Sequence, residues 1–516
     1  MNTVIAMEDG KPTIVHGLTS MKTWINGKDK HRSLIQVNDL SKFNRPAMHA
    51  NSLVNAERAL KERVFAVKKG DTFASPVQPL DGIFDTRLSA YRKRLVSLIP
   101  NRPSLTLEEF PGRYREARKR GIYENAVSKL CVKPLSSSDY KIKGFIKDDK
   151  LDQNVKGDPV PRAILASDPT VNVGVGCIIA HREHDVFEAI DKMFGARTVM
   201  KGANAVVRGQ IIEEAWSEFK QPVAVAADFA KFDAHVSYDA VEFEHSVIGS
   251  MAHGPYERKI MEEAKEHALS GRGTMVCVDG KVSFRRLGGR YSGCMWTSLG
   301  NVILACLMLK EYLDTTGIHY RLINDGDDCV ILCEKSDFHK LGSMHQHLEE
   351  YGFDMVIENP VEEIERIDFC QSRPVFIDGS YIMCRNPHTA LVKDTYCTNR
   401  PSNAADYYSW VRSVGECGLS LTGGMPMFQE FYQCYVRNSD GRRINKGFRA
   451  DGGLKLASQG MHRKYQPVSD DTRFSFWRAF GIDSDTQRYM EDEYRRKCFS
   501  YSAPVESSGL HSDYYF

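Results

Sequence analysis

The chain has 516 residues and a mass of 58.4 kDa, enough to bury a large core and to form more than one subdomain. Charged residues make up 26% and the formal net charge is only +2, which excludes a strongly basic or acidic protein whose partner follows from net charge alone. The 13 cysteines show no C-x-x-C pair and no zinc-ligand spacing, which indicates buried thiols in a reducing compartment. There is no signal-peptide pattern, and the longest apolar run, residues 302–309, is too short to span a bilayer, so we expect a soluble chain.

The first part of the chain combines a polar arm, helices and a basic loop. Residues 1–50 are polar and weakly patterned, which predicts an extended arm, and helical periodicity follows over 56–67 and 114–130. Within the basic loop 141–170, two residues are candidates to grip a triphosphate, Lys147 and Arg162. Taken alone, this segment is more typical of a solvated basic loop.

An acidic strand end follows in P-V-A-V-A-A-D-F-A-K-F-D. The apolar run Val223–Ala227 predicts a short buried strand that ends at Asp228. Asp233 lies five residues later, on the turn or helix start beyond the strand.

A flexible loop then leads into a long helix in S-G-C-M-W-T-S-L-G-N. Ser292 and Gly293 form the loop, and the helix is expected over 295–313. Candidate nucleotide-binding residues of this segment are Ser292, Gly293, Thr297 and Asn301. Thr297 and Asn301 are spaced i, i+4 and share a polar face of its first turns. Asn301, together with Asp233, is suited to hydrogen-bond a sugar hydroxyl, the group that distinguishes RNA precursors from DNA precursors. Ordinary exposed helix residues are an equally good interpretation of Thr297 and Asn301 in isolation.

Three Asp-Gly pairs between β-rich segments predict hairpins, at 279–280, 325–326 and 378–379. The second hairpin, N-D-G-D-D-C-V, places Asp327 and Asp328 at its turn, where a solvated turn is the simplest alternative. With Asp228, these carboxylates suit two Mg²⁺ ions bound against nucleotide phosphates, with Mn²⁺ as a substitute. We expect Asp228 and Asp327 to ligate both ions and Asp328 to be the lesser ligand.

The last part of the chain is mostly helical after Tyr396, so the whole chain belongs to the α+β class, with antiparallel strands packed on helices. A basic cluster between residues 437 and 464 is either a solvated face or a surface that neutralises phosphates. Its candidate RNA-binding residues are Arg437, Arg442, Arg443, Lys446 and Arg449.

Taken in order, these motifs resemble a viral RNA-dependent RNA polymerase of the tombusvirus family and its carmovirus-like relatives. Five motifs occur in that family's order: the basic pair Lys147 and Arg162, D-F-A-K-F-D, S-G-x-x-x-T-x-x-x-N, G-D-D and I-D-F-C-Q. The similarity extends over most of the chain. Residues 369–371 (Phe369, Cys370 and Gln371) resemble the family's primer-grip motif. Where the family usually has S-G-D-M-N-T, this chain has Cys294 and Trp296 in place of the acid and the amide, which puts local template or nucleotide contacts in question.

The resemblance implies a right-hand fold with fingers, palm and thumb. We assign residues 1–50 to an N-terminal extension, 51–220 to fingers, 221–394 to a palm with an interleaved finger segment at 250–290, and 395–516 to a thumb and C-terminal tail. It also implies an enzyme of a positive-strand RNA virus that copies RNA from NTPs, without DNA and without a primer. Its expected location is the host cytoplasm, at membrane-bound replication complexes. The family's polymerase usually carries an amino-terminal membrane-anchoring region, and this sequence shows none. Either the chain is the polymerase portion alone, or a membrane-anchored viral replication protein or host membrane complex is the partner that tethers it.

Other functions fit the same residues less well. A reverse transcriptase would carry a bulky aromatic residue near Asp233 and a Tyr-x-Asp-Asp turn, and a metal-dependent nuclease would not need the sugar-reading pair or Arg162. A catalytically silent RNA-binding scaffold is the alternative from a different class, but a pure binder gains nothing from clustered carboxylates near phosphates. The lysine that would protonate pyrophosphate is left open between Lys335 and Lys340.

Overall fold

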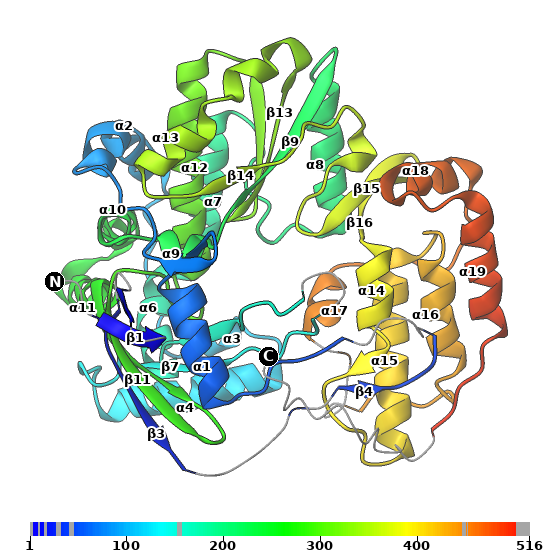
Figure 1. The fold of residues 1–516 in the computed structure, drawn as a ribbon, viewed down its shortest axis with the longest axis horizontal. Coiled ribbons are helices and arrows are strands. Elements are labelled where there is room, and N and C mark those ends of the chain that lie inside the picture. The colour runs from blue at the N-terminus through cyan, green and yellow to red at the C-terminus, as the bar shows by residue number, and fades with distance from the viewer. Residues whose placement is uncertain are drawn as a thin grey trace.

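The computed structural model describes residues 4–8, 11–14, 18–26, 32, 34–40, 46–151, 157–445, 450 and 452–501. Figure 1 shows two parts: one holds the larger sheets with helices α1 to α13, and the other holds helices α14 to α19. The mixture of helices and antiparallel strands confirms the α+β class. No helix in the described ranges has the length and apolarity needed to cross a membrane.

A four-stranded antiparallel sheet carries the predicted acidic residues. Its strand order is β12 (Tyr320–Asn324), β13 (Asp328–Glu334), β9 (Pro222–Phe229) and β14 (Met355–Ile357). Helix α12 (Thr297–Thr316) packs on one face and α8 (Ala205–Ser217) on the other. Because side chains alternate along a strand, Val225 and Ala227 join the core beside α12, whereas Ala224 joins the core beside α8. Burial on both faces explains why β9 is apolar along its length rather than alternating.

The three hairpins are confirmed. Strands β10 (Ser270–Val276) and β11 (Gly280–Leu287) flank the first, β12 and β13 the second, and β15 (Ser372–Ile377) and β16 (Ser380–Arg385) the third. At the third turn both Asp378 and Gly379 have positive φ, as a primed two-residue turn requires. At the second turn only the glycine, Gly326, has positive φ.

A five-stranded sheet lies beside the first one in the chain's larger part. Its order is β3 (Leu18–Ile25), β11, β10, β7 (Ile142–Ile146) and β8 (Ala163–Ala166), with β10 and β7 parallel. The expected helices at 56–67 and 114–130 correspond to α1 (Leu53–Ala59) with a π-helical turn at Leu60–Val64, and to α4 (Ala117–Val132). The other helices of this part are α2 (Ile83–Leu98), α3 (Glu109–Gly112), α6 (Pro169–Ile179), α7 (Glu183–Phe194), α9 (Phe232–His235), α10 (Tyr238–Ile248), α11 (Gly254–Leu269) and α13 (Met344–Glu350).

The C-terminal part is a helical bundle with its own core, built around Trp410, Phe428 and Phe476. Its helices are α14 (Pro387–Lys393), α15 (Ala404–Thr422), α16 (Phe428–Arg437), α17 (Gly452–Ala457), α18 (Asp470–Phe480) and α19 (Ser484–Arg496). The mostly helical character predicted beyond Tyr396 is therefore confirmed.

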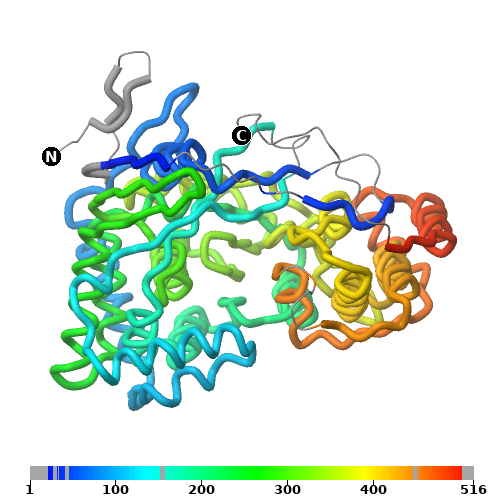
Figure 2. The backbone as a smooth tube through the Cα atoms, turned by 90° about the horizontal axis from the view of Figure 1, so that it is seen from below, coloured from blue at the N-terminus to red at the C-terminus, as the bar shows by residue number. Residues whose placement is uncertain are grey.

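Several contacts tie the two parts together. Two N-terminal strands, dark blue in Figure 2, lie in different parts of the molecule: β3 belongs to the five-stranded sheet, and β4 (Ile35–Gln36) pairs with β17 (Tyr396–Cys397) in the C-terminal part. Lys150 donates to the carbonyl of Lys393 at 2.9 Å, and Lys455 of α17 lies 3.8 Å from Glu116. These contacts join the helical bundle to the part of the chain that holds the five-stranded sheet.

Candidate active site

The three predicted carboxylates gather at one end of the four-stranded sheet. Asp228 and Asp328 are direct partners in the register of β9 and β13, and Asp327 precedes Asp328 at the hairpin turn. Asp228 and Asp327 are exposed, and Asp328 is half-buried. Like charges directly opposite each other destabilise a sheet, so this arrangement indicates a binding role rather than a folding role.

The electrostatics of this edge fit a bound cation. Burial and the neighbouring Asp327 both raise the pKa of Asp328, because two carboxylates compete to ionise in one place. Within the described residues, no group of three or more His, Cys, Asp or Glu side chains is arranged to hold a metal by itself. Mg²⁺ is usually held by one or two carboxylates, waters and substrate phosphates. The neighbouring carboxylates Asp327 and Asp328 therefore suit an ion that binds together with a nucleotide.

Two basic residues that the sequence analysis missed fix the hairpin from behind. Lys201 Nζ lies 2.6 Å from Asp325 Oδ1, and Arg208 forms a second ion pair with the same carboxylate. Burial by itself raises the pKa of Asp325, but the two cations outweigh it and hold the pKa below its usual range. The buried Asn324 adds side-chain hydrogen bonds to both backbone groups of Gly326, at 2.8 and 2.9 Å. The turn that presents Asp327 is therefore rigidly held.

The proposed sugar-reading pair is brought together. Asn301 Nδ2 donates to Asp233 Oδ1 at 3.4 Å, across 68 residues of sequence. Behind the pair, Arg290 Nε donates to Asn301 Oδ1 at 2.8 Å, and the Arg290 guanidinium forms a bidentate ion pair with Glu244. Burial opposes the charge on Arg290, but the Glu244 carboxylate outweighs it and raises the pKa of Arg290 above its ordinary value.

The loop before α12 is joined to the end of the basic loop. Ser292 Oγ accepts from the Leu165 amide at 3.1 Å, and the Gly293 amide donates to the Leu165 carbonyl at 2.8 Å. Thr297 Oγ1 donates to the Tyr291 carbonyl at 2.6 Å, which closes the loop onto the helix start. In this structure the Ser292 hydroxyl, the Gly293 amide and the Thr297 hydroxyl are therefore engaged in hydrogen bonds that shape the loop.

The two departures from the family pattern point inward. Cys294 is 9% exposed, with Sγ 2.9 Å from Ser167 Oγ, and Trp296 is 4% exposed and packs against the His245 ring. Their side chains fill the interior and do not face the acidic edge.

The basic pair is arranged around one carboxylate. Lys147 Nζ lies 3.2 Å from Asp149 Oδ1, and an Arg162 nitrogen lies 3.6 Å from Asp149 Oδ2. Arg63, on the π-helical turn, interacts electrostatically with this group and with the acidic edge. Burial and nearby Arg162 lower the pKa of Arg63, while Asp149, Asp233 and Asp327 oppose that change. Arg63 thus lies within electrostatic reach of both groups, and the sequence analysis did not identify it.

The F-C-Q turn lies against the same hairpin. Cys370 and Gln371 both have positive φ, and the amides and carbonyls of Phe369 and Ser372 bond to each other across the turn. Cys370 Sγ is 3.6 Å from Asp325 Oδ2, and the Arg208 guanidinium lies 5.7 Å from the centre of the Phe369 ring. Arg208 and Asp325 therefore contact both this turn and the acidic hairpin.

The basic cluster of the C-terminal part is only partly available. Arg442 and Arg443 are exposed, whereas Arg437 donates to the carbonyls of Tyr494 and Lys497 at 2.9 and 3.2 Å. Two further predicted residues, Lys446 and Arg449, lie outside the described residues.

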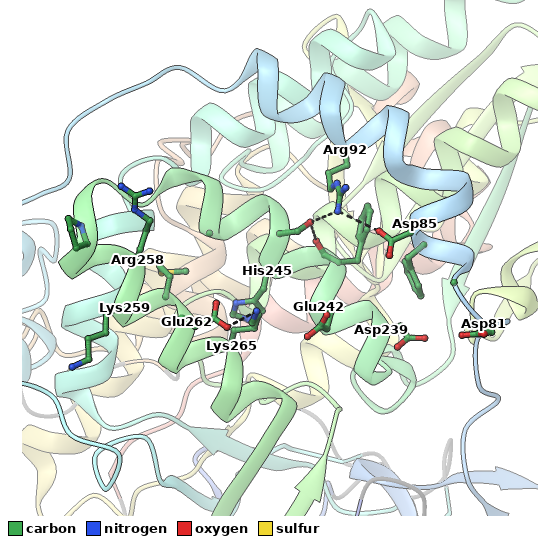
Figure 3. Close-up of a pocket in the computed structure, with 17 residues that line it drawn as sticks. Asp81, Asp85, Arg92, Asp239, Glu242, His245, Arg258, Lys259, Glu262 and Lys265 are labelled. Atoms are coloured by element: carbon green, nitrogen blue, oxygen red, sulfur yellow. Dashed lines mark hydrogen bonds and ion pairs between the residues drawn. The ribbon is translucent and has the colours of Figure 1, made fainter.

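A separate groove of about 940 Å³ runs between α2, α10 and α11. Figure 3 shows Asp81, Asp85 and Asp239 towards one end and Arg258 and Lys259 at the other. None of the predicted catalytic or nucleotide-binding residues lines this groove, so it is not part of the acidic edge.

Comparisons with known proteins agree with the geometry. A family profile described as "Viral RNA dependent RNA polymerase" matches residues 21–501. The RNA-directed RNA polymerase of Maize chlorotic mottle virus is 38% identical over 472 residues, which cover 91% of this chain and 48% of that protein. That of Tobacco necrosis virus (strain A) is 39% identical over 468 residues, 90% of this chain and 64% of that protein. The RNA-directed RNA polymerase of Turnip crinkle virus is 36% identical over 453 residues, which cover 87% of this chain and 57% of that protein. The chain thus spans about half to two thirds of the length of these curated relatives.

Proposed function

The chain belongs to the viral RNA-dependent RNA polymerase family, and from this premise we propose that it joins ribonucleotides in the order set by an RNA template. The observation that carries the proposal is the pairing of Asp228 with Asp328 across β9 and β13, with Asp327 beside them at an exposed turn. The relatives' names, RNA-directed RNA polymerase of viruses such as Turnip crinkle virus, support the same activity and a viral origin, and the positive-strand genome is what the family resemblance implies.

The proposed architecture is a right hand. The four-stranded sheet with α12 and α8 would form the palm, the five-stranded sheet with the basic loop the fingers, and the bundle α14–α19 the thumb. The contacts of β4 with β17 and of Lys150 with Lys393 support this assignment, because they join the proposed fingers to the proposed thumb. Fingers and thumb that are joined in this way suit initiation without a primer.

In the proposed reaction, Asp228, Asp327 and Asp328 would hold two Mg²⁺ ions together with the nucleotide phosphates. When bound, the ions lower the pKa of the attacking hydroxyl and neutralise charge on the leaving pyrophosphate. Lys147, Arg162 and Arg63 supply positive charge for the triphosphate. The F-C-Q turn, held beside the hairpin through Asp325, would support the end of the growing strand.

Asp233 and Asn301 would read the ribose. Asn301 offers an amide donor and Asp233 a carboxylate acceptor, and a 2′-hydroxyl can both accept and donate. The chain's substrates are accordingly an RNA template, its RNA product and NTPs. Replication complexes on host membranes and a membrane-anchored viral partner are the expected setting.

A direct test is incorporation of labelled nucleotides by the purified protein on a short single-stranded RNA with Mg²⁺ or Mn²⁺. Product that disappears in the Asp327→Ala/Asp328→Ala double variant supports the proposal. A folded protein that binds RNA but makes no product under any of these conditions contradicts it and favours the scaffold function.

Replacing Asn301 with alanine should reduce the preference for ATP over dATP by about tenfold, because one hydrogen bond to the ribose is lost. The measurement is kcat/KM for each nucleotide in competition. Thr315→Ala, at the opposite end of α12, is the control and should leave the preference unchanged. An unchanged preference for ATP over dATP in Asn301→Ala would contradict a role of Asn301 in recognising the ribose.

Replacing both Arg442 and Arg443 with alanine should weaken RNA binding and flatten its salt dependence. If each arginine neutralises one phosphate of a single strand, the slope of log K against log salt falls by about 1.4 in magnitude. The Arg258→Ala/Lys259→Ala variant of α11 removes equal charge from the separate groove and is the control. Equal slopes in the wild type and the arginine variant would identify the cluster as a solvated face.

A further inference from the structure

A buried ion pair lies directly behind the sugar-reading residues. Glu244 of α10 is 0% exposed and Arg290 is 3% exposed, and both guanidinium nitrogens at the end of Arg290 bond to the carboxylate. Burying two charges is costly, and apolar residues of the same volume often stabilise a protein as well or better. The pair therefore calls for an explanation other than stability.

The third nitrogen of the guanidinium supplies that explanation. Arg290 Nε donates to Asn301 Oδ1 at 2.8 Å, which settles the orientation of the amide because only the oxygen accepts. With Oδ1 held in this way, Nδ2 is directed to Asp233 Oδ1 at 3.4 Å. The Arg290 backbone amide also donates to the Asp233 carbonyl at 2.9 Å, so one residue positions both members of the pair.

The packing of α12 leaves room for this network at Gly300. A Cβ on Gly300 would overlap the Glu244 carboxylate and come within 2.8 Å of two Arg290 nitrogens. Gly300 has ordinary helical geometry, so the absence of a side chain here serves the close approach of the ion pair and not the backbone.

We infer that Arg290, held by Glu244, is the positioning residue that sets ribose selection, by fixing which end of the Asn301 amide meets the sugar. This inference rests on the proposed polymerase function. Lysine cannot replace arginine here, because a single ammonium group cannot bind both carboxylate oxygens and donate to the amide in a fixed plane. A purely structural pair would instead affect ATP and dATP equally.

The test measures kcat/KM for ATP and for dATP in the same preparations. Arg290→Lys should reduce the ATP:dATP ratio by about tenfold. Glu244→Gln, which keeps the shape of the side chain, is the second variant in case Arg290→Lys does not fold, and it should shift the ratio in the same direction.

Arg473→Lys is the matched control, because Arg473 forms a similarly buried bidentate pair with Glu491, at 2.9 Å, between α18 and α19. Its ratio should equal that of the wild type.

A double-mutant cycle separates positioning from general damage. In the Asn301→Ala background, Arg290→Lys should change the ratio no further, because the group it orients is gone. Equal losses for ATP and dATP in Arg290→Lys and Glu244→Gln, or fully additive effects in the cycle, would overturn the inference and leave the proposed function intact. A wild type that incorporates neither nucleotide on RNA would contradict the proposed function itself, and the inference with it.

Discussion

Replacing Asp327 with alanine should reduce nucleotide incorporation by at least about a thousandfold without unfolding the protein. Asp327 is exposed at a turn, and its side chain supports no core, so its loss should not weaken the fold. It lies next to the Asp228–Asp328 pair, so its removal takes one ligand from the proposed ions. The measurement is the initial rate on a short RNA template, with thermal unfolding of the same sample.

Glu493→Ala provides the control for this prediction. Glu493 is 40% exposed and pairs with Arg496 of the same helix, so its removal should leave both the rate and the unfolding temperature close to wild type. Wild-type activity in a folded Asp327→Ala protein would show that the acidic edge is not where the ions bind.

Replacing Lys201 with alanine should lower activity by about 10- to 100-fold, the usual effect of losing a residue that orients a metal-binding group. Lys201 pairs with Asp325 and also donates to the Asp325 carbonyl at 2.9 Å, so its loss frees the turn that presents Asp327. Arg208 keeps the second ion pair with Asp325 and should preserve the fold. The rate should recover partly in Lys201→Arg, which keeps the charge.

The measurement for Lys201 is the rate as a function of Mg²⁺ concentration at saturating NTP. A loosened turn should require more Mg²⁺ to reach half of the maximal rate, a shift that simple destabilisation does not produce. Arg488→Ala, which removes one partner of an exposed ion pair on α19, is the control. A normal rate and a normal Mg²⁺ dependence in Lys201→Ala would show that activity does not depend on the ion pair between Lys201 and Asp325.

The parts of the site that could be predicted from sequence are those with local signals. The Asp-Gly turns predicted hairpins because a tight turn requires particular backbone angles, and an apolar run ending in Asp228 predicted a strand end. The i, i+4 spacing of Thr297 and Asn301 placed both on one face of a helix. Such signals depend only on neighbouring residues.

The positioning residues gave no such signal. Lys201 and Arg208 meet Asp325 from more than 100 residues away, and Arg290 meets Glu244 across 46. Contacts of this kind depend on how the elements pack, which no local pattern records. One clue was present: Glu244 occupies an otherwise apolar face of α10, between Val241 and Val247. An acidic residue in such a position indicates a buried partner.

Cys294 and Trp296 show what a comparison of motifs leaves open. Because the family has an acid and an amide at these positions, the sequence put the local template or nucleotide contacts in question, and in this structure both side chains are buried against Ser167 and His245. Sequence position within a motif did not indicate the direction of the side chain, because the loop from 288 to 296 has no regular period.

The most direct test of the central claim is whether the template determines the nucleotide that is added. The purified protein would be given four RNA templates, each with a different single base at the coding position, and each of the four labelled NTPs in turn. The account predicts that only the complementary NTP is added to each template, and that the Asp327→Ala/Asp328→Ala variant adds none. Addition of the same nucleotide whatever the template, or addition that survives in the double variant, would contradict it.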